Sequence, residues 1–109
     1  MQKTLMIAAL AALAPTLALA ADDVTSLKYA CKDNKILNVV FVNTAENSFA
    51  IISDMDELIP MKQVTTASGA SYEAINPNYT YRLDTKGQEA SLSAKTEGKE
   101  EVVYADCQG

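Results

Sequence analysis

The chain has 109 residues, with 9 Lys and Arg, 14 Asp and Glu, and no His. Its net charge of −5 argues against nucleic acid or an anionic membrane surface as a partner, because both repel an acidic protein. Without His, no Ser-His or Cys-His nucleophile can be assembled, and no phosphate-binding glycine motif is present. The composition therefore favours a binding protein over an enzyme, and we expect no cofactor and no metal ion.

Residues 1–20 have the layout of a secretory signal peptide. Lys3 precedes an uncharged apolar run at 5–13, Pro15 follows, and Ala18-Leu19-Ala20 is a small-x-small cleavage site. We expect cleavage after about Ala20 and a mature domain over 21–109, with 8 basic and 14 acidic side chains and a net charge of −6. The first Cys lies well inside this segment, so we expect an exported, periplasmic product without a lipid anchor.

The two cysteines, Cys31 and Cys107, lie near opposite ends of the mature segment. In an oxidising compartment an even pair favours a disulfide. A zinc site would need about four ligands, and a redox pair is usually spaced as C-x-x-C, so both alternatives are disfavoured. A domain this short buries only roughly 60–65% of its unfolded surface, and closing so long a loop contributes on the order of 4 kcal/mol.

Short apolar runs, several of them alternating with polar residues, predict β-strands along the whole mature segment. The expected strands are Ser26–Cys31, Ile36–Asn43, Phe49–Ile52, Glu57–Val64, Ser71–Ala74, Tyr79–Asp84, Glu89–Ala94 and Glu101–Cys107. About eight strands separated by turn residues indicate an antiparallel sandwich or a small barrel, and a barrel removes exposed sheet edges. Pro60 falls inside one run, which predicts an edge strand or a bulge there.

Acidic residues gather at Asp54, Asp56 and Glu57. Paired carboxylates serve glycoside hydrolysis, but a domain this small has little volume for a substrate cleft. The first two could also contact calcium, although the complete loop pattern is missing. We expect these acids to be solvated loop residues.

Two Gly-containing segments carry polar or cationic side chains between expected strands, at 68–72 and 85–90. Each is compatible with an ordinary tight turn, in which Gly supplies a positive φ. Their combination is more specific. Ser68-Gly69-x-x-Tyr72 followed by Thr85-Lys86-Gly87-x-x-Ala90, between Tyr29-Ala30-Cys31 and a terminal Cys107, resembles the MliC/PliC family, the bacterial inhibitors of c-type lysozyme. The resemblance spans essentially the whole mature chain.

This resemblance implies an all-β fold, a small eight-stranded antiparallel β-barrel closed by one disulfide. It implies that Ser68 and Lys86 enter the active-site cleft of a c-type lysozyme and contact its two catalytic carboxylates, which protects peptidoglycan. The implied binding residues are Ser68, Gly69, Tyr72, Thr85, Lys86 and Gly87, with Tyr72 supporting its loop from within the sheet.

The chain departs from the family pattern at Ser71, where a longer and often basic residue is common, and at Leu83-Asp84, where aromatic residues are more frequent. Two other functions stay open at this point: a small-ligand- or glycan-binding barrel, and a structural envelope domain. The oligomeric state is not predicted.

Overall fold

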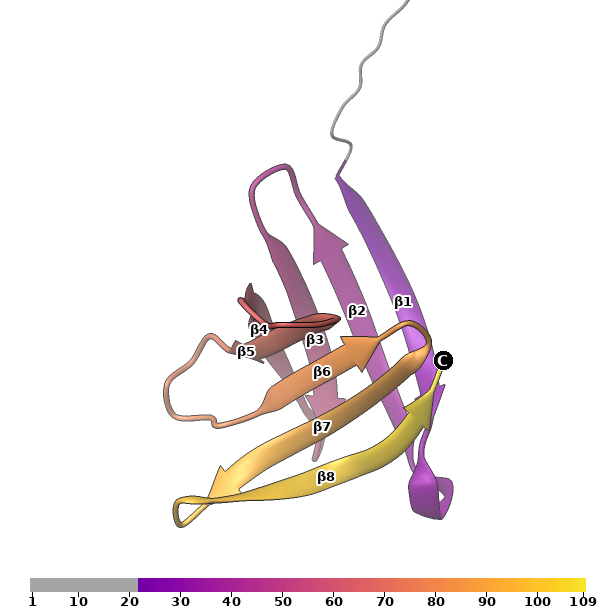
Figure 1. The fold of residues 1–109 in the computed structure, drawn as a ribbon, viewed down its shortest axis with the longest axis vertical. Coiled ribbons are helices and arrows are strands. Elements are labelled where there is room, and N and C mark those ends of the chain that lie inside the picture. The colour runs from indigo at the N-terminus through magenta and orange to yellow at the C-terminus, as the bar shows by residue number, and fades with distance from the viewer. Residues whose placement is uncertain (1–21) are drawn as a thin grey trace, which may run out of the picture.

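The computed structural model describes residues 22–109, which form eight β-strands and one short 3₁₀ turn at Lys32–Asn34. The strands are β1 Asp23–Ala30, β2 Ile36–Asn43, β3 Ser48–Asp54, β4 Glu57–Val64, β5 Ala70–Ala74, β6 Arg82–Lys86, β7 Glu89–Thr96 and β8 Lys99–Gln108. Each strand pairs antiparallel with the next, and β8 returns to β1, so the sheet is a closed barrel. Figure 1 shows β1–β3 running steeply in the view while β6–β8 cross them at a large angle. The predicted fold class is confirmed.

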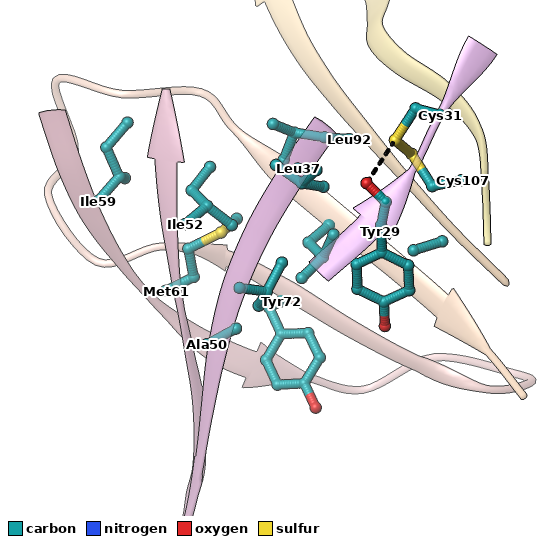
Figure 2. Close-up of a cluster of buried hydrophobic side chains, with 13 residues drawn as sticks. Tyr29, Cys31, Leu37, Ala50, Ile52, Ile59, Met61, Tyr72, Leu92 and Cys107 are labelled. Atoms are coloured by element: carbon teal, nitrogen blue, oxygen red, sulfur yellow. Dashed lines mark hydrogen bonds between the residues drawn. A yellow bond between two sulfur atoms is a disulfide. The ribbon is translucent and has the colours of Figure 1, made fainter. Parts of the chain in front are cut away.

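The barrel interior is filled by side chains that alternate along the strands. Leu37, Ile52, Met61, Leu83 and Leu92 are completely buried, and Figure 2 shows four of these labelled in the packed cluster. Each such side chain contributes roughly 1.5–3 kcal/mol by leaving water. Because the interior is occupied, the surfaces that are free to bind a partner lie on the outside and at the ends of the barrel.

The barrel closes through a narrow seam between β1 and β8. β1 pairs with β2 over all eight of its residues, from Asp23 to Ala30. It pairs with β8 only where Ala30 lies opposite Gln108. The disulfide between Cys31 and Cys107 covalently joins the chain at this seam, as predicted (Figure 2).

The strand expected over 79–84 is shifted in the structure, where β6 runs from Arg82 to Lys86. The side chain of Thr80 explains the difference. Its Oγ1 donates to the carbonyl of Lys95 at 2.9 Å and accepts from the Lys95 amide at 2.9 Å. This side chain replaces backbone pairing with β7 at that point, so the ladder begins two residues later. As a result, Thr85 and Lys86 lie at the end of a strand and not in a loop.

The expectation for Pro60 is wrong, because β4 is paired on both sides and Pro60 pairs in register with Ile51 of β3. The β4–β5 register begins at Met61. The Pro60 carbonyl accepts a hydrogen bond from the Ile75 amide, one residue beyond the end of β5, and the imide nitrogen faces the same side of the strand, away from β3. The missing N–H therefore costs no ladder hydrogen bond, which allows Pro60 within an inner strand.

The expectation that Asp54 is solvated is also wrong. Asp54 is only 9% exposed. Its two carboxylate oxygens accept hydrogen bonds from the hydroxyls of Tyr81 at 2.5 Å and Tyr104 at 2.9 Å. Asp54 thereby connects β3, the segment before β6, and β8. Nearby Glu57 accepts a 2.9 Å hydrogen bond from Tyr79, while Asp56 is exposed in the β3–β4 turn.

These hydrogen bonds change the acidity of the tyrosines. Burial is the largest cause that raises the pKa of Tyr81 well above its usual range, followed by the hydrogen bond to Asp54. The same two causes, in the same order, raise the pKa of Tyr104. Both tyrosine hydroxyls therefore stay protonated and continue to donate to Asp54, and the three side chains form a structural hydrogen-bond network.

Among residues 22–109, no helix has the length and apolar character needed to cross a membrane. The expected signal peptide at 1–20 and its cleavage site lie outside the described residues.

Candidate partner-binding site

Two segments far apart in the sequence meet at one rim of the barrel: residues 65–69, which connect β4 to β5, and the β6–β7 turn at 87–88. The pairing of β5 with β6 places Ala70 opposite Thr85, and Thr85 Oγ1 donates a 3.2 Å hydrogen bond to the Ala70 carbonyl. Ser68 and Lys86 each lie one or two residues beyond this pair. The sheet register therefore brings the two predicted contact residues to the same rim.

Gly69 makes this approach possible. Its φ is +68°, and a β-carbon added to it would overlap the carbonyl oxygen of Thr85 and lie 3.3 Å from the β-carbon of Lys86. Only glycine combines this backbone conformation with such close packing. Gly87 has a φ of +59° at the start of the β6–β7 turn, but a β-carbon there would meet no atom within 4 Å. Gly69 is thus required by packing as well as by conformation.

Ser68 and Lys86 line the same open hollow, which has a volume of about 420 Å³. Asp84, Thr85, Glu89 and Asp106 also line it. A second hollow, of about 390 Å³, is lined by Gln63, Thr65, Thr66 and Gly69 on one side and by the β2–β3 connection on the other. Segment 65–69 contributes residues to the walls of both hollows and therefore lies between them.

The two side chains provide complementary chemistry at this rim. Both Ser68 and Lys86 are exposed. Within residues 22–109, the ion pairs are formed by Arg82 and not by Lys86, so the Lys86 ammonium is available to a partner. An ammonium offers three donors and no acceptor, whereas a hydroxyl can donate or accept. Such a pair can address carboxyl groups in either protonation state.

The remaining predicted site residues occupy different positions. Thr85 and Gly87 flank Lys86 at the rim. Tyr72 is only 6% exposed, and its ring lies 5.7 Å from that of Phe41 in the core. This packing is compatible with a supporting role, which stays a prediction. Among the described residues, no group of three His, Cys, Asp or Glu side chains is arranged to hold a metal ion.

Sequence reasoning missed a polar network beside the rim. Ser71 lies opposite Asp84 in the β5–β6 pair, and its hydroxyl donates a 2.6 Å hydrogen bond to Asp84 Oδ1. Arg82 donates to the same oxygen at 3.1 Å and to Glu73 Oε2 at 2.7 Å. The two positions at which the chain departs from the family pattern, Ser71 and Asp84, are therefore direct partners. The alternation Arg82-Leu83-Asp84-Thr85-Lys86 was the signal that could have indicated a charged face.

Together these features define a small disulfide-closed β-barrel that presents a hydroxyl from the β4–β5 connection and a cation from the adjacent end of β6. Comparison with known proteins specifies the class further. Residues 29–101 match the family model described as membrane-bound lysozyme-inhibitor of c-type lysozyme, and the chain belongs to this family.

Individual relatives agree with this family. The chain is 34% identical over 87 residues to the membrane-bound lysozyme inhibitor of C-type lysozyme of Pseudomonas aeruginosa, a match that covers 78% of this chain and 65% of the relative. The chain therefore spans about two thirds of that protein's length.

Two solved structures have the same fold. The periplasmic lysozyme inhibitor of C-type lysozyme from Salmonella typhimurium, PliC-St, matches with a TM-score of 0.70 and 40% identity, over 78% of this chain and 95% of that one. MliC of Pseudomonas aeruginosa, solved in complex with hen egg white lysozyme, matches with a TM-score of 0.64 and 28% identity, over 90% and 97%.

Proposed function

We propose that this protein is a periplasmic inhibitor of c-type lysozyme, which inserts segment 65–69 and the β6–β7 turn into the active-site cleft and protects peptidoglycan without catalysing a reaction. The observation that carries the proposal is the position of Ser68 and Lys86 on one rim, around one hollow. Family membership and the relative solved with hen egg white lysozyme support the choice of partner.

The chemistry of the partner fits the two side chains. A retaining glycosidase carries two carboxyl groups roughly 5–5.5 Å apart, one protonated and one ionised. The Lys86 ammonium can donate to both, and the Ser68 hydroxyl can accept from the protonated acid or donate to the ionised one. Occupation of these acids blocks access of the polysaccharide, so inhibition requires no covalent step.

The construction of the rim favours tight docking. Segment 65–69 is fixed against Thr85 by the close approach at Gly69, and Thr85 is itself hydrogen-bonded to Ala70. A contact surface that is already ordered loses little conformational entropy when it binds. The rim is therefore a binding surface that is already ordered before the partner docks.

A ligand-binding barrel was the main alternative. An eight-stranded barrel can hold one small ligand when its interior is open. Here the interior is filled by completely buried side chains such as Leu37, Met61 and Leu92. The packed core therefore favours a function on the outer surface over one inside the barrel.

The test is to mix purified residues 21–109 with hen egg white lysozyme, then measure lysis of bacterial cell walls and the mass of the complex in the same samples. We expect loss of lysis in step with formation of a complex. Undiminished lysis and no complex at micromolar concentrations, repeated with other c-type lysozymes, would overturn the proposed function.

A further inference from the structure

We propose that Asp84 is a specificity-determining residue of this binding face and that its carboxylate receives a cationic side chain of the lysozyme, next to the partner's acidic pair. This inference rests on the proposed function. It adds a second electrostatic requirement for the partner, which is a cationic side chain beside the two carboxyl groups that Lys86 contacts.

The carboxylate of Asp84 is held in place from one side only. Ser71 and Arg82 both donate to Oδ1, at 2.6 Å and 3.1 Å. Oδ2 receives no hydrogen bond from any other described residue. Ser71 is only 2% exposed, so the donor beneath Asp84 is anchored in the packed sheet. The arrangement leaves one oxygen of an oriented carboxylate unused.

That oxygen belongs to a side chain which lies within reach of a partner. The Asp84 side chain is 45% exposed and lines the same hollow as Ser68 and Lys86. A docked protein that contacts Lys86 would therefore also cover Asp84. Arg82 meets this carboxylate only at Oδ1 and is shared with Glu73, so a partner that covers Asp84 without donating to Oδ2 leaves a carboxylate oxygen unpaired. This loss is costly, so Asp84 discriminates between partners.

Arg82, Asp84 and Lys86 alternate along β6 and therefore share one face of the strand. Side chains two residues apart on a strand are separated by ~6.6–6.8 Å. The face thus presents positive, negative and positive charge in sequence. Acidic groups of a partner placed at Lys86 are repelled by Asp84 unless a Lys or Arg of that partner lies between. A lysozyme with such a cation satisfies both charges at once.

The experiment is a double-mutant cycle. The inhibitor variant is Asp84→Asn, which removes the charge and keeps an oxygen for Ser71 and Arg82. It is paired with hen egg white lysozyme variants in which one Lys or Arg at the edge of the cleft is changed to Gln at a time. Inhibition constants are measured for all pairs. The control is Glu101→Gln, since Glu101 is an exposed β8 residue that does not line the hollow.

We expect one cleft cation whose neutralisation weakens inhibition by wild type at least five-fold but weakens inhibition by Asp84→Asn less than two-fold. Glu101→Gln should behave as wild type with every lysozyme variant. If no cation couples to Asp84, or if Asp84→Asn inhibits more tightly than wild type, the inference is wrong while the proposed function stands. If the wild-type protein does not inhibit lysozyme, both this inference and the proposed function are wrong.

Circular dichroism and thermal melting establish that each variant is folded. Should Asp84→Asn fail to fold, Asp84→Thr carries the same test, because Thr is neutral and suited to a strand.

Discussion

Gly69 packs so closely on Thr85 that a β-carbon at position 69 would overlap the Thr85 carbonyl oxygen. This contact joins the β4–β5 connection to the end of β6, and thereby fixes the position of Ser68 relative to Lys86. The geometry of the candidate site therefore depends on a residue that presents no side chain of its own.

Gly69→Ala should lower the free energy of unfolding by about 1–3 kcal/mol, because the new methyl group clashes and the residue must keep a positive φ. It should also weaken lysozyme inhibition, since segment 65–69 has to move away from Thr85. Thermal melting and inhibition constants measure the two effects. The matched control is Gly98→Ala, where φ is +79° but a β-carbon meets nothing within 4 Å. That variant should lose some stability and keep full inhibition.

Lys86→Ala should weaken inhibition by about 2–5 kcal/mol, the usual loss when one partner of a desolvated charge pair is removed. The exposed Lys95→Ala variant removes the same charge from β7, away from the hollow, and should change inhibition little. Equal inhibition constants for Lys86→Ala and wild type would remove Lys86 from the assigned role.

The Cys31→Ala, Cys107→Ala double variant should lose on the order of 4 kcal/mol of stability, because the disulfide closes nearly the whole folded chain. Urea unfolding of wild type, with and without a reductant, provides the comparison. A midpoint that does not change on reduction would show that the β1–β8 seam holds without its covalent link.

Stability should decrease at alkaline pH. Folding raises the pKa of Tyr81 and Tyr104 above the ordinary tyrosine value of 10. Their contribution is therefore complete below about pH 10 and is lost as the pH rises above it, because the unfolded chain releases these protons first. Tyr81→Phe should reduce stability by about 1–2 kcal/mol near neutral pH and flatten the alkaline decline. Chemical denaturation from pH 7 to 11 measures both, and an unchanged slope in the variant would contradict the assignment.

Association with a basic lysozyme should slow as ionic strength rises, because the net charge of −6 over residues 21–109 attracts the partner at long range. Stopped-flow measurements over a salt series should show a falling association rate with a smaller change in dissociation. An association rate that is independent of salt would exclude electrostatic steering.

Much of the fold could be predicted because its signals are local. Period-two patterning indicated the strands, and β2 and β4 begin and end where the sequence indicated. The boundary of β6 could not be predicted, since it depends on the Thr80 side chain replacing backbone contacts with a distant strand. The burial of Asp54 likewise depends on tyrosines 27 and 50 residues away in the chain.

The candidate site divides in the same way. Ser68 and Lys86 were indicated by motifs, and their shared rim follows from the β5–β6 register. The sequence indicated Asp84 only as a departure from the family pattern, and did not indicate a role in the site. Its hydrogen bond to Ser71 requires the knowledge that these residues, 13 positions apart, face each other across two strands.

The narrow pairing between β1 and β8 has one more consequence. In the described part of the chain, β1 meets β8 only at Ala30, so the preceding residues of β1 keep a row of amide and carbonyl groups without a neighbouring strand. A row of this kind can template the addition of a foreign strand, and the charges of Asp23 and Lys28 oppose such addition. In a crowded or overexpressed preparation, self-association of this barrel would begin along β1, close to the rim that carries Lys86, because Gly109 packs against Leu27 and Tyr29 and donates a hydrogen bond to the carbonyl of Gln88 in the β6–β7 turn.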